Sequence, residues 1–188
     1  MPKPYVLAIN AVSGGGKTAL TKLLHETLPR SVLFSFDEFD DTNVHPEDMI
    51  EWFARGGNLE EFKCPAMKAA VDALIQAGTH PQIILDYPFG RDHSLFRDLI
   101  DLSIWIETPP DVAMARRIIR DLGRTPDLSP QDELQRLKEE LSHYLLKARP
   151  VYLDETHRIT ADLILDGMMS LETLRDQILE RIKRTEGK

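Results

Sequence analysis

Residues 9–18 read Ile9-Asn10-Ala11-Val12-Ser13-Gly14-Gly15-Gly16-Lys17-Thr18, and this stretch decides the fold. An apolar run at residues 5–9 leads into it, and a helical pattern at residues 19–24 follows it. This order predicts a buried strand that ends in a glycine turn, and a helix that begins directly after the turn. The backbone N–H groups of such a turn and the positive end of the helix dipole together form a cradle for phosphate oxygens.

The residues of the turn have separate expected roles. Four of them are expected to line the phosphate cradle of a bound nucleotide: Ser13, Gly14, Gly15 and Gly16. Lys17 is expected to reach the outer phosphates and to act in catalysis, and the hydroxyl of Thr18 is expected to ligate Mg²⁺. The pattern G-x-x-x-x-G-K-[ST] asks for glycine at position 11, where this chain has Ala11. Alanine fits there if its φ angle is negative.

Length and charge limit the classes of protein to which the chain can belong. Its 188 residues suffice for one α/β domain over residues 1–188, and the net charge of −8 excludes a broad basic surface for nucleic acid or an anionic membrane. The single cysteine, Cys64, excludes an internal disulfide and indicates a reducing compartment. No signal peptide and no run of about 18 apolar residues is visible, so we expect a cytoplasmic protein.

Strand and helix patterns alternate along the chain. Short apolar runs predict strands at residues 5–9, 31–36, 82–86, 103–107 and 163–165. Helical patterns recur at residues 19–24, 46–55, 66–77, 95–100, 110–120, 131–147 and 171–184. This alternation predicts a parallel sheet with helices on both faces, in which ligands bind beyond the carboxyl ends of the strands. Asp37 and Asp86 stand at two of these strand ends, as does the glycine turn.

Four segments of the chain resemble the uridine kinase-like group of P-loop kinases, which is related more distantly to nucleoside monophosphate kinases. These segments are residues 13–18, 36–39, 116–121 with Arg124, and 161–165. The resemblance implies a three-layer α/β fold with five parallel strands in the order 2-3-1-4-5. It also implies ATP with Mg²⁺ as the phosphoryl donor, and a helical lid over residues 117–130.

The resemblance and the residues together suggest a role for each acid and arginine. Asp37 is a candidate base for the acceptor hydroxyl, and Asp86 a candidate Mg²⁺ ligand through water, although the two roles could be exchanged. Arg116, Arg117 and Arg120 form an arginine cluster on one helix, where Arg116 and Arg120 share a face. The cluster could bind phosphate, with Arg120 acting in catalysis; a solvated face paired with nearby acids is the alternative. By resemblance, the backbone at Gly167 would lie against adenine.

The acceptor side is less well specified. Candidates for acceptor binding are Asp37, Arg91, His45, Tyr87 and Arg124. The chain departs from the uridine kinase pattern at Asp40, where an aromatic residue is usual, and at Val44, where a ribose-binding acid is usual. Because the departures touch only the acceptor side, the acceptor need not be uridine.

The sequence therefore predicts an ATP-dependent kinase that phosphorylates a hydroxyl group of a nucleoside-like, sugar-like or vitamin-like molecule. Three alternatives stay open: a nucleoside monophosphate kinase, a nucleotide-binding switch without transfer activity, and an ATPase subunit of a nucleic-acid machine. The expected partners are a nucleotide and a small acceptor, with no nucleic acid and no membrane. The oligomeric state, monomer or homodimer, is open.

Overall fold

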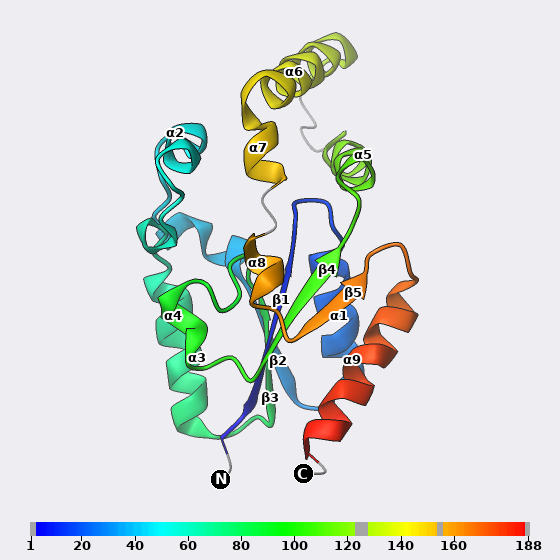
Figure 1. The fold of residues 1–188 in the computed structure, drawn as a ribbon. Helices are drawn as coiled ribbons and strands as arrows, with labels where there is room; N and C mark the ends of the chain where they lie inside the picture. Colours follow the sequence, from blue (N-terminus) through cyan, green and yellow to red (C-terminus); the bar gives the residue numbers. More distant parts are fainter. Residues whose placement is uncertain (1–2, 123–127, 154–155, 187–188) are drawn as a thin grey trace.

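Five parallel strands form the centre of the protein, as the computed structural model shows for residues 3–122, 128–153 and 156–186 (Figure 1). They are β1 (Tyr5–Ala11), β2 (Ser31–Ser35), β3 (Gln82–Asp86), β4 (Leu102–Glu107) and β5 (Leu163–Asp166). The strands lie in the order β2-β3-β1-β4-β5, and every neighbouring pair is parallel. The predicted fold class and strand order are both confirmed.

Helices cover both faces of the sheet (Figure 1). On one face, Val6 and Ala8 pack with residues of α3 (Pro65–Ala77) and α4 (Ser94–Arg97). On the other face, Leu7 and Ile9 pack with residues of α1 (Lys17–Thr27) and α9 (Leu171–Glu186). Neighbouring residues of a strand point to opposite faces, so β1 is buried on both sides, which explains its continuous apolar run.

Caps explain where the helices begin and end. The helix expected from Pro46 is the shorter α2 (Met49–Ala54), because the Asp48 side chain accepts hydrogen bonds from the backbone N–H groups of Ile50 and Glu51 at its first turn. Helix α3 begins at Pro65, one residue earlier than predicted, and ends as predicted at Ala77, where Gly78 caps it with φ 59°. A 3₁₀ helix, η1 (Phe36–Thr42), follows β2 where the sequence indicated only a strand end.

The three helices that directly follow β4 stand beyond the carboxyl ends of the strands (Figure 1). They are α5 (Pro110–Asp121), α6 (Pro130–His143) and α7 (Arg149–Tyr152), and a π-helical turn at Tyr144–Ala148 joins the last two. Pro150 has no N–H to donate, so the α-helical ladder cannot continue through it unchanged. The helix predicted to end near residue 147 therefore continues through this turn to Tyr152.

The register of the strands brings the site residues together. Asp86 lies beside Ile9 on one side and beside Ser35 on the other, so the ends of β1, β2 and β3 meet at one edge of the sheet. The glycine turn follows β1 at this edge, and η1 follows β2. Within the described ranges, no helix combines the length and the apolar character needed to cross a bilayer.

Candidate active site

The phosphate loop, residues 12–16, joins β1 to α1. Gly14 and Gly16 have φ angles of 84° and 100°, which side-chain-bearing residues rarely adopt, and the N–H of Gly15 donates to the carbonyl of Val12 at 2.8 Å. Among the described residues other than glycine, only Arg30 has a positive φ. Ala11 therefore meets the condition that makes alanine acceptable at its position.

Ala113 and Thr108 contact the phosphate loop and restrict its conformation. A side chain at Gly14 would place its Cβ 2.1 Å from the carbonyl oxygen of Ala113 in α5, so only glycine fits this contact. The buried hydroxyl of Thr108 donates to the carbonyl of Gly15 at 2.9 Å. Sequence reasoning missed Thr108, because nothing local to the end of β4 indicates that the loop lies against it.

A cavity of about 380 Å³, called here the loop cavity, opens at the phosphate loop. Residues 11–19 supply its floor, and the other residues that line it are Asp37, Pro88, Arg116 and Arg120. The structure thus brings together, from four separate segments, the predicted phosphate-binding turn, the candidate base and two of the predicted arginines. Its lining supplies backbone N–H groups, hydroxyls and three cationic side chains, which suits a polyphosphate.

Lys17 and Asp86 form a hydrogen-bonded ion pair at the floor of this site. The Asp86 side chain is only 1% exposed, and its Oδ2 has no hydrogen-bond partner within the described residues. An unpaired carboxylate oxygen buried beside a phosphate cradle has the chemistry that Mg²⁺ and its water ligands require. Thr18 lines the loop cavity and is exposed, so its hydroxyl is accessible to the same ion.

Asp37 differs from Asp86 in its surroundings. It lies on η1, is exposed, and has no hydrogen bond or ion pair within the part of the chain that the structure describes. Hydrogen bonds to Asp121, together with the charges of Asp121 and Asp37, raise the pKa of the Arg120 guanidinium. Asp37 therefore lines the loop cavity as an exposed carboxylate without a partner among the described residues.

The predicted arginine cluster divides into two groups. Arg116 and Arg120 line the loop cavity, and Arg116 also donates to the carbonyl of Gly167 at 3.2 Å. Arg117 instead binds Glu140 at 2.6 Å and the hydroxyl of Tyr152, so it connects α5 to α6 and α7. The anion-binding role predicted for the cluster is thus limited to Arg116 and Arg120 among the described residues.

One further predicted position lies outside the loop cavity. Gly167 is not among the residues that line the loop cavity, but its carbonyl accepts a hydrogen bond from Arg116, which does line it. A Cβ at Gly167 would lie 1.9 Å from Thr108 Oγ1, so the close approach of the β5–α9 turn to β4 requires glycine. Arg124 lies outside the described residues, within the proposed lid.

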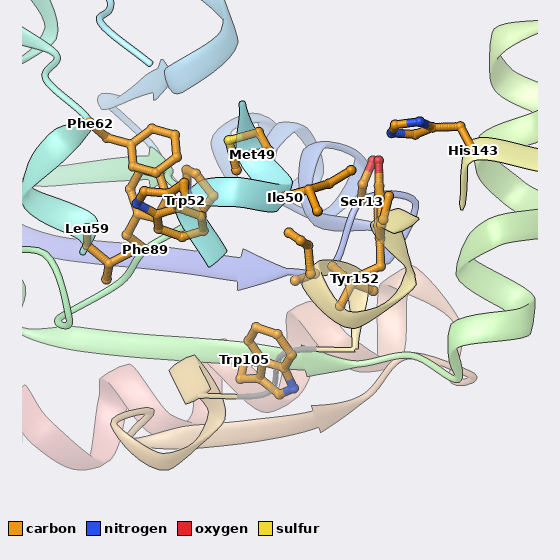
Figure 2. Close-up of a pocket in the computed structure, with 15 residues that line it drawn as sticks. Ser13, Met49, Ile50, Trp52, Leu59, Phe62, Phe89, Trp105, His143 and Tyr152 are labelled. Carbon is orange, nitrogen blue, oxygen red and sulfur yellow. The ribbon is translucent and has the colours of Figure 1, made fainter. Parts of the chain in front are cut away.

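A second cavity of about 480 Å³ lies on the other side of the phosphate loop. It is called here the aromatic cavity, because Trp52, Phe62, Phe89, Trp105 and Tyr152 line it (Figure 2). It shares four lining residues with the loop cavity: Ala11, Val12, Ser13 and Pro88. None of these five aromatic residues is among the acceptor-binding candidates that the sequence suggested.

Three predicted acceptor-binding residues line neither cavity. Arg91 lies at the amino ends of β4 and β5, where it pairs with Asp162 at 2.6 Å and donates to the carbonyls of Ile100 and Asp101 at 3.0 Å. The prediction that Arg91 holds the acceptor therefore disagrees with the structure. The short loop after β3 folds back across the sheet, which its sequence did not reveal.

Tyr87 and His45 are also displaced from their predicted role. Tyr87 is 0% exposed and shares a hydrogen bond with His93 inside the aromatic core, and burial raises the pKa of its phenol strongly. His45 packs edge-on against Phe36 and Phe62 and pairs with Asp40 at 2.9 Å. Both side chains support the aromatic wall from outside the cavities.

Comparisons with known proteins agree with this architecture. No protein-family model matches the chain. The uridine kinase of Borrelia hermsii (strain HS1 / DAH) is 28% identical over 210 residues, which covers 97% of this chain and 96% of that protein. The uridine kinase of Latilactobacillus sakei subsp. sakei (strain 23K) is 22% identical over 205 residues, covering 92% and 97%.

Solved structures show the same fold. A shikimate kinase from Acinetobacter baumannii in complex with shikimate has a TM-score of 0.52 at 18% identity, over 99% of this chain and 96% of that one. A gluconokinase from Sinorhizobium meliloti 1021 has a TM-score of 0.51 at 16% identity, over 98% and 95%. The sequence relatives are named uridine kinases and the solved structures share the fold, so the chain is similar to the uridine kinase-like P-loop kinases, in agreement with the resemblance noted from its sequence.

Proposed function

We propose that the protein transfers the γ-phosphoryl group of Mg-ATP to a hydroxyl group of a small molecule. One observation carries the proposal: the loop cavity and the aromatic cavity adjoin at the phosphate loop and share the lining residues Ala11, Val12, Ser13 and Pro88. A nucleotide in the first cavity and an alcohol in the second would meet at this turn. The names of the sequence relatives, uridine kinases, agree with a hydroxyl acceptor.

The charges of the loop cavity support the donor half of the reaction. The transition state of phosphoryl transfer spreads negative charge over the equatorial oxygens, so positioned cations and N–H groups do most of the catalysis. Lys17, Arg116 and Arg120 supply the cations, and the phosphate loop supplies the N–H groups. We assign Mg²⁺ to Thr18 and Asp86, where it would neutralise charge on the phosphate oxygens.

The difference between the two acids supports their roles. Asp86 is buried and paired with Lys17, whereas Asp37 is exposed in the loop cavity and unpaired within the described residues. We therefore assign proton acceptance to Asp37 and not to Asp86. In the transfer, the acceptor oxygen bonds to the γ-phosphorus, its proton passes to Asp37, and the bond from the γ-phosphorus to ADP breaks.

The test is ADP release from Mg-ATP in the presence of hydroxyl-bearing acceptors. Acceptor-dependent release is expected, and Asp37→Asn should lower turnover by about 100-fold or more while ATP affinity stays unchanged. Asp41→Asn is the matched control, because Asp41 is exposed on the same 3₁₀ helix but lines neither cavity. ATP binding without release on any acceptor would instead favour a nucleotide-binding switch.

A further inference from the structure

The lining of the aromatic cavity limits the chemistry of the acceptor, an inference that rests on the proposed function. Among the described residues that line it, none carries a carboxylate, ammonium or guanidinium group, and His143 is the only one with an ionisable nitrogen. The loop cavity beside it has Asp37, Lys17 and two arginines. The charged groups therefore lie on the nucleotide side of the phosphate loop, and the acceptor side is neutral.

Aromatic rings form one end of the aromatic cavity (Figure 2). Trp52 and Phe62 meet edge to face with centroids 5.3 Å apart, and Phe62 lies 4.6 Å from Phe89 at an angle of 45°. The three side chains are 5–7% exposed, so packing fixes them. The indole N–H of Trp52 donates to the carbonyl of Asn58 at 2.9 Å, which leaves only the ring to face a ligand.

The other end of the cavity carries its polar groups. Figure 2 shows Ser13, His143 and Tyr152 close together, away from Trp52, Phe62 and Phe89. Ser13 belongs to the phosphate loop, and it also lines the loop cavity. The hydroxyl of Tyr152 accepts from Arg117, so it still has a proton to donate. An acceptor would therefore put its hydroxyl at the Ser13 end and its apolar body at the Trp52 end.

This division argues against charged and highly hydroxylated acceptors. A carboxylate or phosphate in the cavity would lose its water shell without gaining a cation, which is costly for a buried charge. A sugar alcohol would leave several hydroxyls without partners against the Trp52–Phe62–Phe89 wall. A cavity of about 480 Å³ is within the range of sites for small organic ligands.

We propose that the acceptor is a neutral alcohol with few hydroxyl groups and a flat, apolar body. The ring lies against Trp52, Phe62 and Phe89, and the hydroxyl lies beside Ser13. The hydroxyl oxygen forms a bond to the γ-phosphorus of ATP, the bond from that phosphorus to the bridging oxygen breaks, ADP leaves with the electron pair, and the hydroxyl proton passes to Asp37. The product is a phosphate monoester.

The chain has its own reporter for this test, because its two tryptophans, Trp52 and Trp105, both line the cavity. Tryptophan fluorescence of the full chain is followed during titration with 4-phenylbutan-1-ol, 4-phenylbutanoate, sorbitol and uridine. The alcohol and the carboxylate share one phenylalkyl body and differ in charge. The alcohol is expected to bind about 10-fold or more tightly than each of the other three.

A cationic side chain introduced into the aromatic cavity should favour a carboxylate ligand, which tests whether the lack of a cation excludes charged acceptors. Ile50→Lys puts an ammonium group at a lining position, and it should shift the preference toward 4-phenylbutanoate by about 10-fold. Ile119→Lys adds the same charge at a position that is 73% exposed on α5 and lines neither cavity, so the preference should not change.

The outcomes separate the two proposals. Equal or tighter binding of the carboxylate, sorbitol or uridine overturns the inference, and so does the absence of any fluorescence change. Binding of the alcohol with the expected preference but without ADP release supports this inference and overturns the proposed function. ADP release with sorbitol or uridine, and none with neutral aryl alcohols, supports the kinase and overturns the neutral apolar acceptor.

Discussion

The loop cavity and the aromatic cavity lie side by side but are built in different ways. The lining of the loop cavity includes the whole contiguous run of residues 11–19, which offers backbone N–H groups and charge. The aromatic cavity takes its lining from the phosphate loop, α2, the segment around Phe62, Pro88–Phe89, β4 and the α6–α7 region, and it offers mainly rings and apolar side chains. Most of the proposed nucleotide site is therefore encoded in one short segment, whereas the proposed acceptor site depends on packing between distant segments.

The largest expected effect on turnover comes from substituting Lys17, which lines the loop cavity and is paired with Asp86. Lys17→Ala removes a positioned cation, so turnover should fall by about 100- to 1,000-fold in an ADP-release assay. It also leaves the buried Asp86 carboxylate without its cation, which should cost about 3 kcal/mol of unfolding free energy.

A second substitution separates these two consequences. Asp86→Asn in the Lys17→Ala chain removes the unpaired charge, so thermal or urea unfolding should show recovered stability while turnover stays low. Recovery of turnover together with stability would mean that Lys17 acts only by neutralising Asp86.

A backbone change should break the loop cavity alone. Gly14→Ala combines a φ of 84° with a Cβ 2.1 Å from the Ala113 carbonyl oxygen, so ATP affinity measured by calorimetry should drop by about 10-fold or more. Gly56→Ala is the control, since Gly56 has a φ of 105°, has no atom near the added Cβ and lines neither cavity. It should cost about 1 kcal/mol of stability and leave ATP affinity intact. Equal ATP affinity in the two variants would contradict the close contact of the loop with α5.

Substitutions of Arg116 and Arg91 test which arginines belong to the loop cavity. Arg116→Ala should raise the KM for ATP by about 5-fold with little change in stability, because the side chain is exposed at the cavity wall.

Arg91→Ala should lower the unfolding free energy by about 1–3 kcal/mol and leave both KM values unchanged, because its partners are Asp162 and two backbone carbonyls far from the phosphate loop. A raised acceptor KM in Arg91→Ala would restore the role that the sequence suggested.

The smallest expected effect is a pH dependence on the aromatic side. His93 packs against Tyr87 and Phe89, with Glu60 at 3.6 Å and Arg97 nearby, and burial lowers its pKa despite the opposing charge of Glu60. The unfolded chain therefore binds a proton more readily than the folded chain below about pH 6.5, so stability should decrease as pH falls through that value. The slope for one proton cannot exceed about 1.4 kcal/mol per pH unit.

Urea unfolding at pH 7.5 and pH 5.5 measures this slope. His93→Gln should reduce the difference between the two pH values, whereas His80→Gln, in the turn before β3, should retain it. An unchanged difference in His93→Gln would assign the acid sensitivity to other groups.

Local signals predicted the elements that depend on local interactions. The bounds of β3 and the end of α3 agree with the prediction, because a short apolar run marks the strand and a glycine marks the end of the helix. Pro46 misled the prediction of α2, because the capping Asp48 outweighs a proline as a start signal in this segment. Tyr87 misled the prediction of the acceptor site, because an aromatic residue at a strand end can face the core as readily as a cavity.

The sequence by itself determined the phosphate loop, the parallel sheet and the two acids at the strand ends, because each depends on a short pattern of residue types. Only the tertiary structure decided that Arg91 lies at the opposite edge, that Arg117 binds α6 and α7, and that rings from distant segments enclose a neutral cavity. The physical reason is that backbone hydrogen bonds and turns are short-range, whereas burial of apolar side chains depends on which surfaces the whole chain brings together.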